Sequence, residues 1–209
     1  MNLLLEKIYL NKMEFVTSGL LKEYCRSLKL EYTQTIKNLL FAGYLIRIFR
    51  GIFYVRTLEE KKLGKSKYSA YDFVAKGLEL KHVNAWYFGL TTAIALNHLT
   101  HERFTLDYVL NDTFFRPRPL TIEGHKFRFI KMKPALLSIG IKKHGNLRYS
   151  DTEKTILDLI YLRRQNGIPD ERIILEISDW VKGISEKKIK KYLALYPKTI
   201  KAAFRKMKP

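Results

Sequence analysis

A run of polar side chains between residues 32 and 38 carries groups that can contact nucleic-acid bases and phosphates. Asparagine and glutamine hydrogen-bond adenine through two atoms, threonine contacts a base edge or a thymine methyl, and lysine pairs with phosphate. Ile36, Leu39 and Leu40 have helical spacing, which predicts that the polar side chains share the opposite face of one helix. The candidate contact residues here are Tyr32, Thr33, Gln34, Thr35, Lys37 and Asn38.

A basic hairpin is predicted directly after this helix. Residues 45–49 and 52–56 are rich in β-branched and aromatic side chains, and Arg50-Gly51 separates them as a turn. Arg47 and Arg50 can hold phosphate or enter a narrow minor groove. Gly51 lets the turn approach a nucleic-acid backbone closely.

The elements that must position these residues are two further helices. Leu3, Leu4 and Ile8 predict a short first helix. Apolar residues from 21 to 28 predict a second one, with Thr17 or Ser18 as its N-cap. The third begins at an N-cap on Thr33 and ends at Ala42-Gly43. Two helices joined by a short turn and followed by a hairpin predict a winged helix-turn-helix over residues 1–58, and the alternative is a small helical domain with a solvated polar face.

The remaining chain predicts a separate domain of mixed structure. Residues 59–67 are charged and interrupted by Gly and Ser, which indicates a linker. Over residues 68–209, predicted strands come first and helices follow, so the fold class is α+β. A hairpin across residues 123–125, a strand at 137–141 and an S-x-x-E capping box at 150–153 are expected in it. The aromatic run at 86–88 predicts core packing rather than base stacking.

The net charge of +19 favours a polyanionic partner. Both parts of the chain are basic, with +6 over residues 1–65 and +13 over residues 66–209. A single cysteine, Cys25, excludes an internal disulfide and fits a reducing compartment. No apolar stretch is long enough for a membrane span, and the first residues become charged too early for a secretory segment, so a cytoplasmic protein is expected.

The end of the chain forms a second candidate surface. Residues 187–209 contain nine basic residues and no acidic ones, and mutual repulsion among them would be relieved by DNA, RNA or an acidic protein. The candidate backbone or partner contacts are Lys187, Lys188, Lys190, Lys191, Lys198, Lys201 and Arg205.

No catalytic residue, metal site or cofactor is predicted. His98 and His101 can share a helix face but have no further ligand cluster nearby, and Cys25 lies on an apolar face where a thiol is usually inert. The sequence contains no phosphate-binding glycine loop or dinucleotide fingerprint. A nuclease targeted by the winged helix remains an alternative. It would need acidic residues to converge, such as Glu123, Asp151, Glu153 and Asp158. An RNA- or protein-binding module is a further alternative.

Three segments resemble AbiEi-type antitoxins, predicted transcriptional regulators of viral defence systems. Residues 36–53 resemble the family's L-x-x-L-V-x-x-G-x-L-x-x-x-x-x-G-x-Y stretch, with Phe53 where the family often has Tyr. Residues 86–100 resemble its Y-x-G-L-x-x-A-L-x-x-x-x-L-T segment, and residues 149–159 resemble its S-x-x-E-x-T-L-x-D-L segment. The segments occur in the family's order.

This resemblance implies a sequence-specific repressor of double-stranded DNA that autoregulates its own operon as the antitoxin of a toxin–antitoxin system. It implies an operator made of inverted repeats, a nucleotidyltransferase-like toxin as functional or physical partner, and an antitoxin role for the second domain. Because the sequence shows no catalytic motif, no enzymatic activity is expected for this chain.

Overall fold

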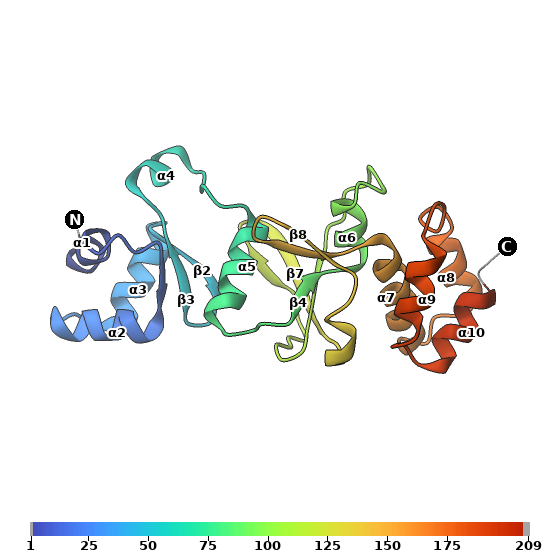
Figure 1. Ribbon diagram of the computed structural model, residues 1–209. Helices are drawn as coiled ribbons and strands as arrows, with labels where there is room; N and C mark the ends of the chain where they lie inside the picture. Colours follow the sequence, from blue (N-terminus) through green and yellow to red (C-terminus); the bar gives the residue numbers. More distant parts are fainter. Residues whose placement is uncertain (1, 207–209) are drawn as a thin grey trace. The chain divides into compact units, whose positions relative to one another are not determined.

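Ten α-helices and two β-sheets lie within residues 2–206, which are the residues that the computed structural model describes. The predicted α+β class is therefore confirmed (Figure 1). The chain divides into two compact units, Met1–His82 and Val83–Pro209, each with its own sheet. Across the described residues, no helix combines the length and apolar character that crossing a membrane requires.

The first unit begins with a helix, a short strand and two more helices before its hairpin. Its elements are α1 (Leu3–Leu10), β1 (Phe15–Thr17), α2 (Ser18–Ser27), α3 (Tyr32–Phe41), β2 (Leu45–Phe49), β3 (Ile52–Val55), α4 (Leu58–Leu63) and α5 (Ala70–Leu80). The three strands form an antiparallel sheet in the order β1-β3-β2. The hairpin predicted around Arg50-Gly51 is confirmed.

Helices cover both faces of this sheet. On one face, α1, α2 and α3 enclose an apolar core with residues such as Leu21, Ile36 and Phe53. On the other face, α5 packs closely: a Cβ on Gly77 would lie 2.5 Å from the Phe49 ring, and the Tyr54 and Phe73 ring centroids are 4.9 Å apart. Because both faces are covered, all four residues of β3 are buried.

The predicted linker at 59–67 is instead part of the first unit. Thr57 caps α4 in a capping box with Glu60, and Glu60 is itself buried. Its carboxylate accepts hydrogen bonds from the Tyr54 hydroxyl at 2.6 Å, the Thr57 amide at 2.8 Å and the Lys67 amide at 2.7 Å. The division between units therefore falls after α5, later than the sequence pattern indicates.

The second unit combines a mixed sheet with a group of helices. Its elements are β4 (Trp86–Phe88), α6 (Leu90–Leu96), β5 (Asp107–Asn111), β6 (Leu120–Ile122), β7 (His125–Lys131), the 3-10 turn η1 (Pro134–Leu136), β8 (Ile141–His144), β9 (Leu147–Ser150), α7 (Thr152–Gln165), α8 (Asp170–Ile177), α9 (Glu186–Leu193) and α10 (Lys198–Lys206). The strand order is β6-β7-β5-β4-β9-β8, with β5–β7 and β4–β9 parallel.

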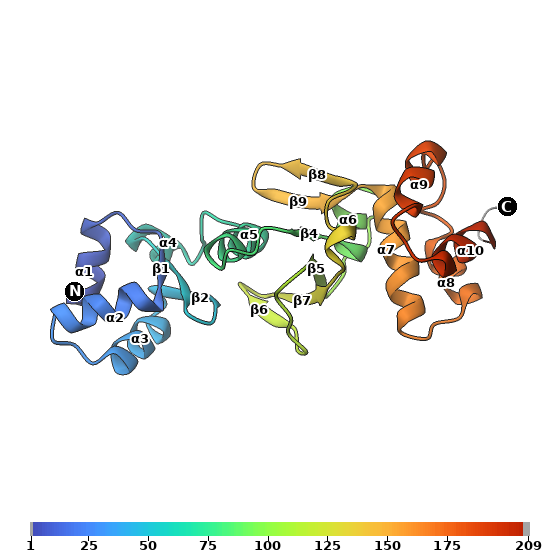
Figure 2. The same cartoon turned by 60° about the horizontal axis from the view of Figure 1, so that its bottom comes forward.

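Helix α7 joins the sheet to the other helices of this unit. It contacts α6 and β9 on the sheet side and α8, α9 and α10 on the other side, as Figure 2 shows. Its residues from Glu153 to Tyr161 are all buried, because neighbours cover it on nearly every side. Trp86, Tyr87 and Phe88 are buried in β4, which confirms the predicted core role of this aromatic run.

Two local predictions in the second unit are wrong. The expected strand at 137–141 is mostly irregular, and β8 begins only at Ile141. The S-x-x-E pattern at Ser150 and Glu153 is not a capping box. Asp151 is the N-cap, and the Glu153 carboxylate accepts a hydrogen bond from the Ser185 amide at 2.9 Å. The Ser185 amide, far along the chain, thus takes the place of the Ser150 amide as the partner of Glu153.

Candidate nucleic-acid interface

Glu31, rather than Thr33, begins the third helix. Its carboxylate accepts hydrogen bonds from the amides of Thr33 and Gln34, so α3 starts at Tyr32. These bonds lower the pKa of Glu31. The second helix begins as predicted, with Thr17 as its N-cap. Lys29, at a φ of 53°, turns the chain between the two helices.

The exposed face of α3 carries four of the six predicted contact residues. Thr33, Gln34, Lys37 and Asn38 are exposed, while Ile36 and Leu39 are buried against α1 and α2. The Gln34 side-chain amide donates to Asn38 Oδ1 at 2.9 Å, so the two amides are held in one orientation. This is a polar face with one cation and no carboxylate among these four side chains.

Thr35 does not belong to this face. It is buried, and its hydroxyl donates to the Glu31 carbonyl oxygen at 2.5 Å. Residues four positions apart share one face of a helix, so Thr35 lies on the same side as the buried Leu39 and faces the core. Thr35 is therefore a structural residue.

Tyr32 lies at the edge of the face and is half-buried. The Lys22 ammonium lies 5.6 Å from the centre of its ring. Burial raises the pKa of the Tyr32 hydroxyl, and the nearby charge of Arg47 opposes that rise. Arg47 thus lies close enough to α3 for its charge to act on this helix.

The hairpin presents two arginines, Arg47 from β2 and Arg50 from the turn. Arg47 and Arg50 are exposed, and the Arg47 guanidinium lies 5.6 Å from the Phe53 ring centre. Gly51 has a φ of 79°, its carbonyl accepts from the Ser18 amide at 2.8 Å, and a Cβ there would lie 2.9 Å from Ser18 Oγ. Gly51 is therefore required by the packing of the turn on α2, and its predicted approach to a nucleic-acid backbone stays a prediction.

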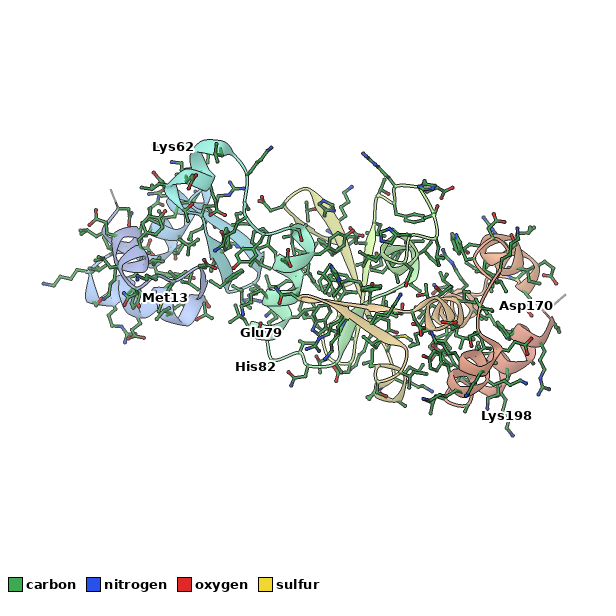
Figure 3. The ribbon with its side chains drawn as sticks, turned by 45° about the horizontal axis from the view of Figure 1, so that its top comes forward. Met13, Lys62, Glu79, His82, Asp170 and Lys198 are labelled. Carbon is green, nitrogen blue, oxygen red and sulfur yellow. The ribbon has the colours of Figure 1, made fainter. Side chains whose placement is uncertain are left out.

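The basic end of the chain is only partly available. Lys187, Lys190 and Lys191 on α9 are exposed, as are Lys198 and Arg205 on α10. Figure 3 labels Lys198 at the start of α10. Lys188 differs, because its ammonium lies 3.2 Å from carboxylate oxygens of both Asp151 and Glu153. Burial works to lower the pKa of Lys188, but these two carboxylates outweigh it and raise the pKa.

Lys201 also has a local partner. It is half-buried, and its ammonium donates to the Ala194 carbonyl at 3.5 Å. Of the seven predicted residues at this end, five thus remain exposed cations without an ion pair among the described residues.

A buried charged cluster in the second unit was not evident from sequence. Lys154 and Asp158 are both fully buried, with 2.5 Å between Nζ and Oδ1. The Tyr87 and Tyr196 hydroxyls each donate to Asp158 at 2.6 Å and accept from the Lys154 ammonium at 2.9 and 2.8 Å. The spacing of Lys154 and Asp158 indicates their pairing, but nothing local indicates Tyr196.

Electrostatics in this cluster follow from burial. Loss of solvent lowers the pKa of Lys154, while the charge of Asp158 opposes that change. Burial raises the pKa values of Tyr87 and Tyr196 well above their usual range, and Asp158 adds to the rise. Both tyrosines therefore stay protonated as donors.

Three of the acidic residues that a nuclease would need are engaged by lysines. Asp151 and Glu153 are bridged by Lys188, and Asp158 is paired with Lys154. Among residues 2–206, no group of three or more His, Cys, Asp or Glu side chains is arranged to hold a metal ion. Cys25 is buried in the first unit, and burial raises the pKa of its thiol.

Comparisons with known proteins identify a fold relative only. No family model matches the sequence. No curated protein matches it. The structure is similar to the crystal structure of the RV2827C protein from Mycobacterium tuberculosis, with a TM-score of 0.60 and 12% sequence identity. The match covers 97% of this chain and 74% of that one, so the likeness extends over both units.

Proposed function

We propose that this protein is a DNA-binding transcriptional repressor of the AbiEi antitoxin type, and that its first unit binds operator DNA as a winged helix-turn-helix. The observation that carries the proposal is the exposed polar face of α3 beside the arginine-bearing hairpin. The order α1-β1-α2-α3-β2-β3, with an antiparallel β1-β3-β2 sheet, is the order of elements in winged helices. The net charge of +19 favours the same partner.

In this proposal α3 enters the major groove. Gln34 and Asn38 read base edges, and their mutual hydrogen bond leaves an amide donor on Asn38 and a carbonyl acceptor on Gln34 for the DNA. Lys37, Arg47 and Arg50 bind phosphates and set the register of the helix. Glu31 contributes indirectly, by fixing where α3 begins.

The operator-binding test uses a duplex from the DNA immediately upstream of the gene. Asn38→Ala should weaken binding by about 5- to 150-fold, the range of one lost base contact at about 1–3 kcal/mol, and only on the specific duplex. Lys37→Ala and Arg50→Ala should weaken binding to all duplexes alike. Fluorescence anisotropy measures each affinity.

Two matched controls accompany these variants. Lys62→Ala removes an exposed lysine from α4, labelled in Figure 3, and should leave affinity unchanged. Thr35→Ser keeps the buried hydroxyl that donates to the Glu31 carbonyl and should also bind normally. Unchanged binding by a folded Lys37→Ala/Asn38→Ala/Arg50→Ala variant would overturn the proposal.

The antitoxin part of the proposal rests on the resemblance of residues 86–100 and 149–159 to family segments. These residues build the β4 and α7 core of the second unit, which is where the antitoxin activity would reside. If the adjacent gene encodes a nucleotidyltransferase-like toxin, cells that express this toxin should grow only when they also express the intact protein with its residues 83–209. The Asn38→Ala variant should still protect these cells, because Asn38 is in the first unit. If no form of this protein protects the cells, the antitoxin role is refuted.

A further inference from the structure

A cavity of about 400 Å³ lies within the second unit and belongs to neither predicted surface. It is lined by the α7-facing side of β5 and β7, by the last turns of α7, and by residues 115–117 of the loop between β5 and β6. This volume is within the range of small-molecule sites in proteins. The cavity is separate from the proposed operator surface, which belongs to the first unit.

The sheet register explains why the cavity forms here. Tyr108 on β5 pairs with Arg128 on β7, and Leu110 pairs with Ile130 one pleat further along the same face. Helix α7 packs over Leu110 and its neighbours in the core, whereas Tyr108 is half-buried and Arg128 is exposed. The cavity therefore opens where the helix leaves the sheet uncovered.

The loop after β5 is folded back to form the mouth of the cavity. The side-chain oxygen of Asn111 accepts hydrogen bonds from the amides of Thr113 and Phe114, and the Phe114 ring packs edge-on against Phe129 with centroids 4.8 Å apart. Phe115 and Arg116 follow directly. Phe115 is 64% exposed, so its ring is open to solvent at the mouth of the cavity.

The charge of the lining has one sign. Arg116, Arg128, Lys131 and Arg163 line the cavity, and no acidic residue does. Arg163 is neutralised by a two-pronged ion pair with Glu176 on α8. The other three have no carboxylate partner among residues 2–206. Three neighbouring cations without a counter-charge repel one another, and a bound anion removes that cost.

The rest of the lining is suited to a flat, partly apolar group beside the anion. Leu90, Leu159 and Leu162 supply apolar surface, while Phe115 and Tyr108 supply aromatic rings for stacking. Gln165 and Asn166 at the end of α7 offer amide donors and acceptors to a polar ring edge. An inorganic anion would use the cations alone, so the combined lining indicates a phosphate attached to an aromatic base.

We propose that this cavity binds a nucleoside phosphate, with Arg116 and Arg128 on the phosphates and Phe115 stacked on the base. The nucleotide is either free or the phosphorylated end of a single strand, since both present the same chemistry to the cavity.

Binding is measured by isothermal titration calorimetry with the full-length protein. ATP, AMP, adenosine and inorganic tripolyphosphate are the free probes, and a 5′-phosphorylated single-stranded oligonucleotide and its unphosphorylated twin are the strand-end probes. At least one phosphorylated nucleotide probe should bind saturably, and adenosine should bind at least tenfold more weakly than ATP. Competition between ATP and the phosphorylated oligonucleotide, and their relative affinities, distinguishes the free from the terminal nucleotide.

Variants test the assigned residues. Arg128→Ala and Arg116→Ala should each weaken binding at least tenfold, and Phe115→Ala should weaken nucleotide binding without changing that of tripolyphosphate. The controls Arg118→Ala, on the same loop, and Lys126→Ala, on the same strand, remove exposed cations that do not line the cavity and should have no effect.

Three results would overturn the proposal. One is no saturable binding of any phosphorylated nucleotide probe. Another is binding that Arg116→Ala and Arg128→Ala leave unchanged. The third is equal affinity for tripolyphosphate and ATP with no effect of Phe115→Ala, which would make the cavity an anion site without base recognition.

Discussion

At the scale of single residues, Lys154 and Asp158 are the clearest case of a pair whose meaning depends on burial. On an exposed helix this spacing contributes a few tenths of a kcal/mol. Here both side chains are inaccessible, and the two tyrosine hydroxyls satisfy the remaining donors and acceptors. Removing solvent from both charges is costly, so the pair is stable only while each partner is present.

Removing one partner of this pair should therefore destabilise the protein strongly. Lys154→Met or Asp158→Asn should each lower the free energy of unfolding by about 3–5 kcal/mol, because an uncompensated group stays buried. The double variant Lys154→Met/Asp158→Asn should lose less than the sum of the two single losses. Urea denaturation measures all three.

An exposed pair provides the comparison. Lys182 and Asp179, also on the second unit, form an ion pair with both side chains largely in solvent. Lys182→Met should leave the unfolding free energy almost unchanged. Fully additive losses in the buried double variant would contradict the coupling described here.

At the scale of elements, α4 shows how one buried carboxylate turns a charged segment into ordered structure. Burial works to raise the pKa of Glu60, but hydrogen bonds from the Tyr54 hydroxyl and from the amides of Lys67 and Thr57 outweigh it and lower the pKa. The glutamate thus holds β3, α4 and the approach to α5 together. A charged, glycine-containing sequence is no guarantee of a flexible linker.

Glu60→Gln should destabilise the first unit by about 1–3 kcal/mol at neutral pH, since the amide nitrogen of Gln must face a donor. The lowered pKa means that the carboxylate's contribution is present above its ordinary pKa of 4.5 and is lost as pH falls below it. The difference in unfolding free energy between the unmodified protein and Glu60→Gln should therefore become smaller in acid. Thermal unfolding of both proteins, monitored from about pH 3 to about pH 7 so that the range includes the usual titration of a glutamate, checks this.

Glu59→Gln is the matched control, because Glu59 lies next to Glu60 on the same helix but is exposed. It should unfold like the unmodified protein at every pH. If the stability difference between the unmodified protein and Glu60→Gln stays constant down to the lowest pH, Glu60 does not act through its charge.

At the scale of the whole molecule, positive charge is distributed over both units. The proposed operator face is in the first unit, and the exposed lysines of α9 and α10 are in the second. A protein that uses both on one DNA site releases more counterions than α3 and the hairpin alone would release. The salt dependence of binding therefore reports how much of the chain contacts the backbone.

Replacing Lys187, Lys190 and Lys191 by Gln should reduce the slope of log affinity against log salt by about 0.9 for each phosphate contact removed. Lys12, Lys62 and Lys143 are exposed elsewhere, and changing them to Gln removes the same charge. The slope for this control set should stay near its original value. Equal slopes for both triple variants would exclude α9 from the DNA-binding surface.

Much of the local structure around the candidate site follows from sequence. The spacing of Ile36 and Leu39 predicts the buried side of α3, and Arg50-Gly51 predicts the hairpin turn. These features depend on neighbours within one or two helical turns or across a two-residue turn. Such contacts are encoded by side-chain periodicity and backbone preference, which a sequence displays directly.

Other features were decided only by tertiary structure. Helix α5 covered the second face of the first sheet, and the distant Ser185 amide took the Glu153 carboxylate that the pattern assigned to a local cap. Lys154 became a buried ion through Tyr87 and Tyr196, which lie far from it in the chain. The sequence alone determined the buried side of α3 and the position of the hairpin turn. Which polar groups are buried depends on contacts between distant segments, and periodicity along the chain carries no information about them.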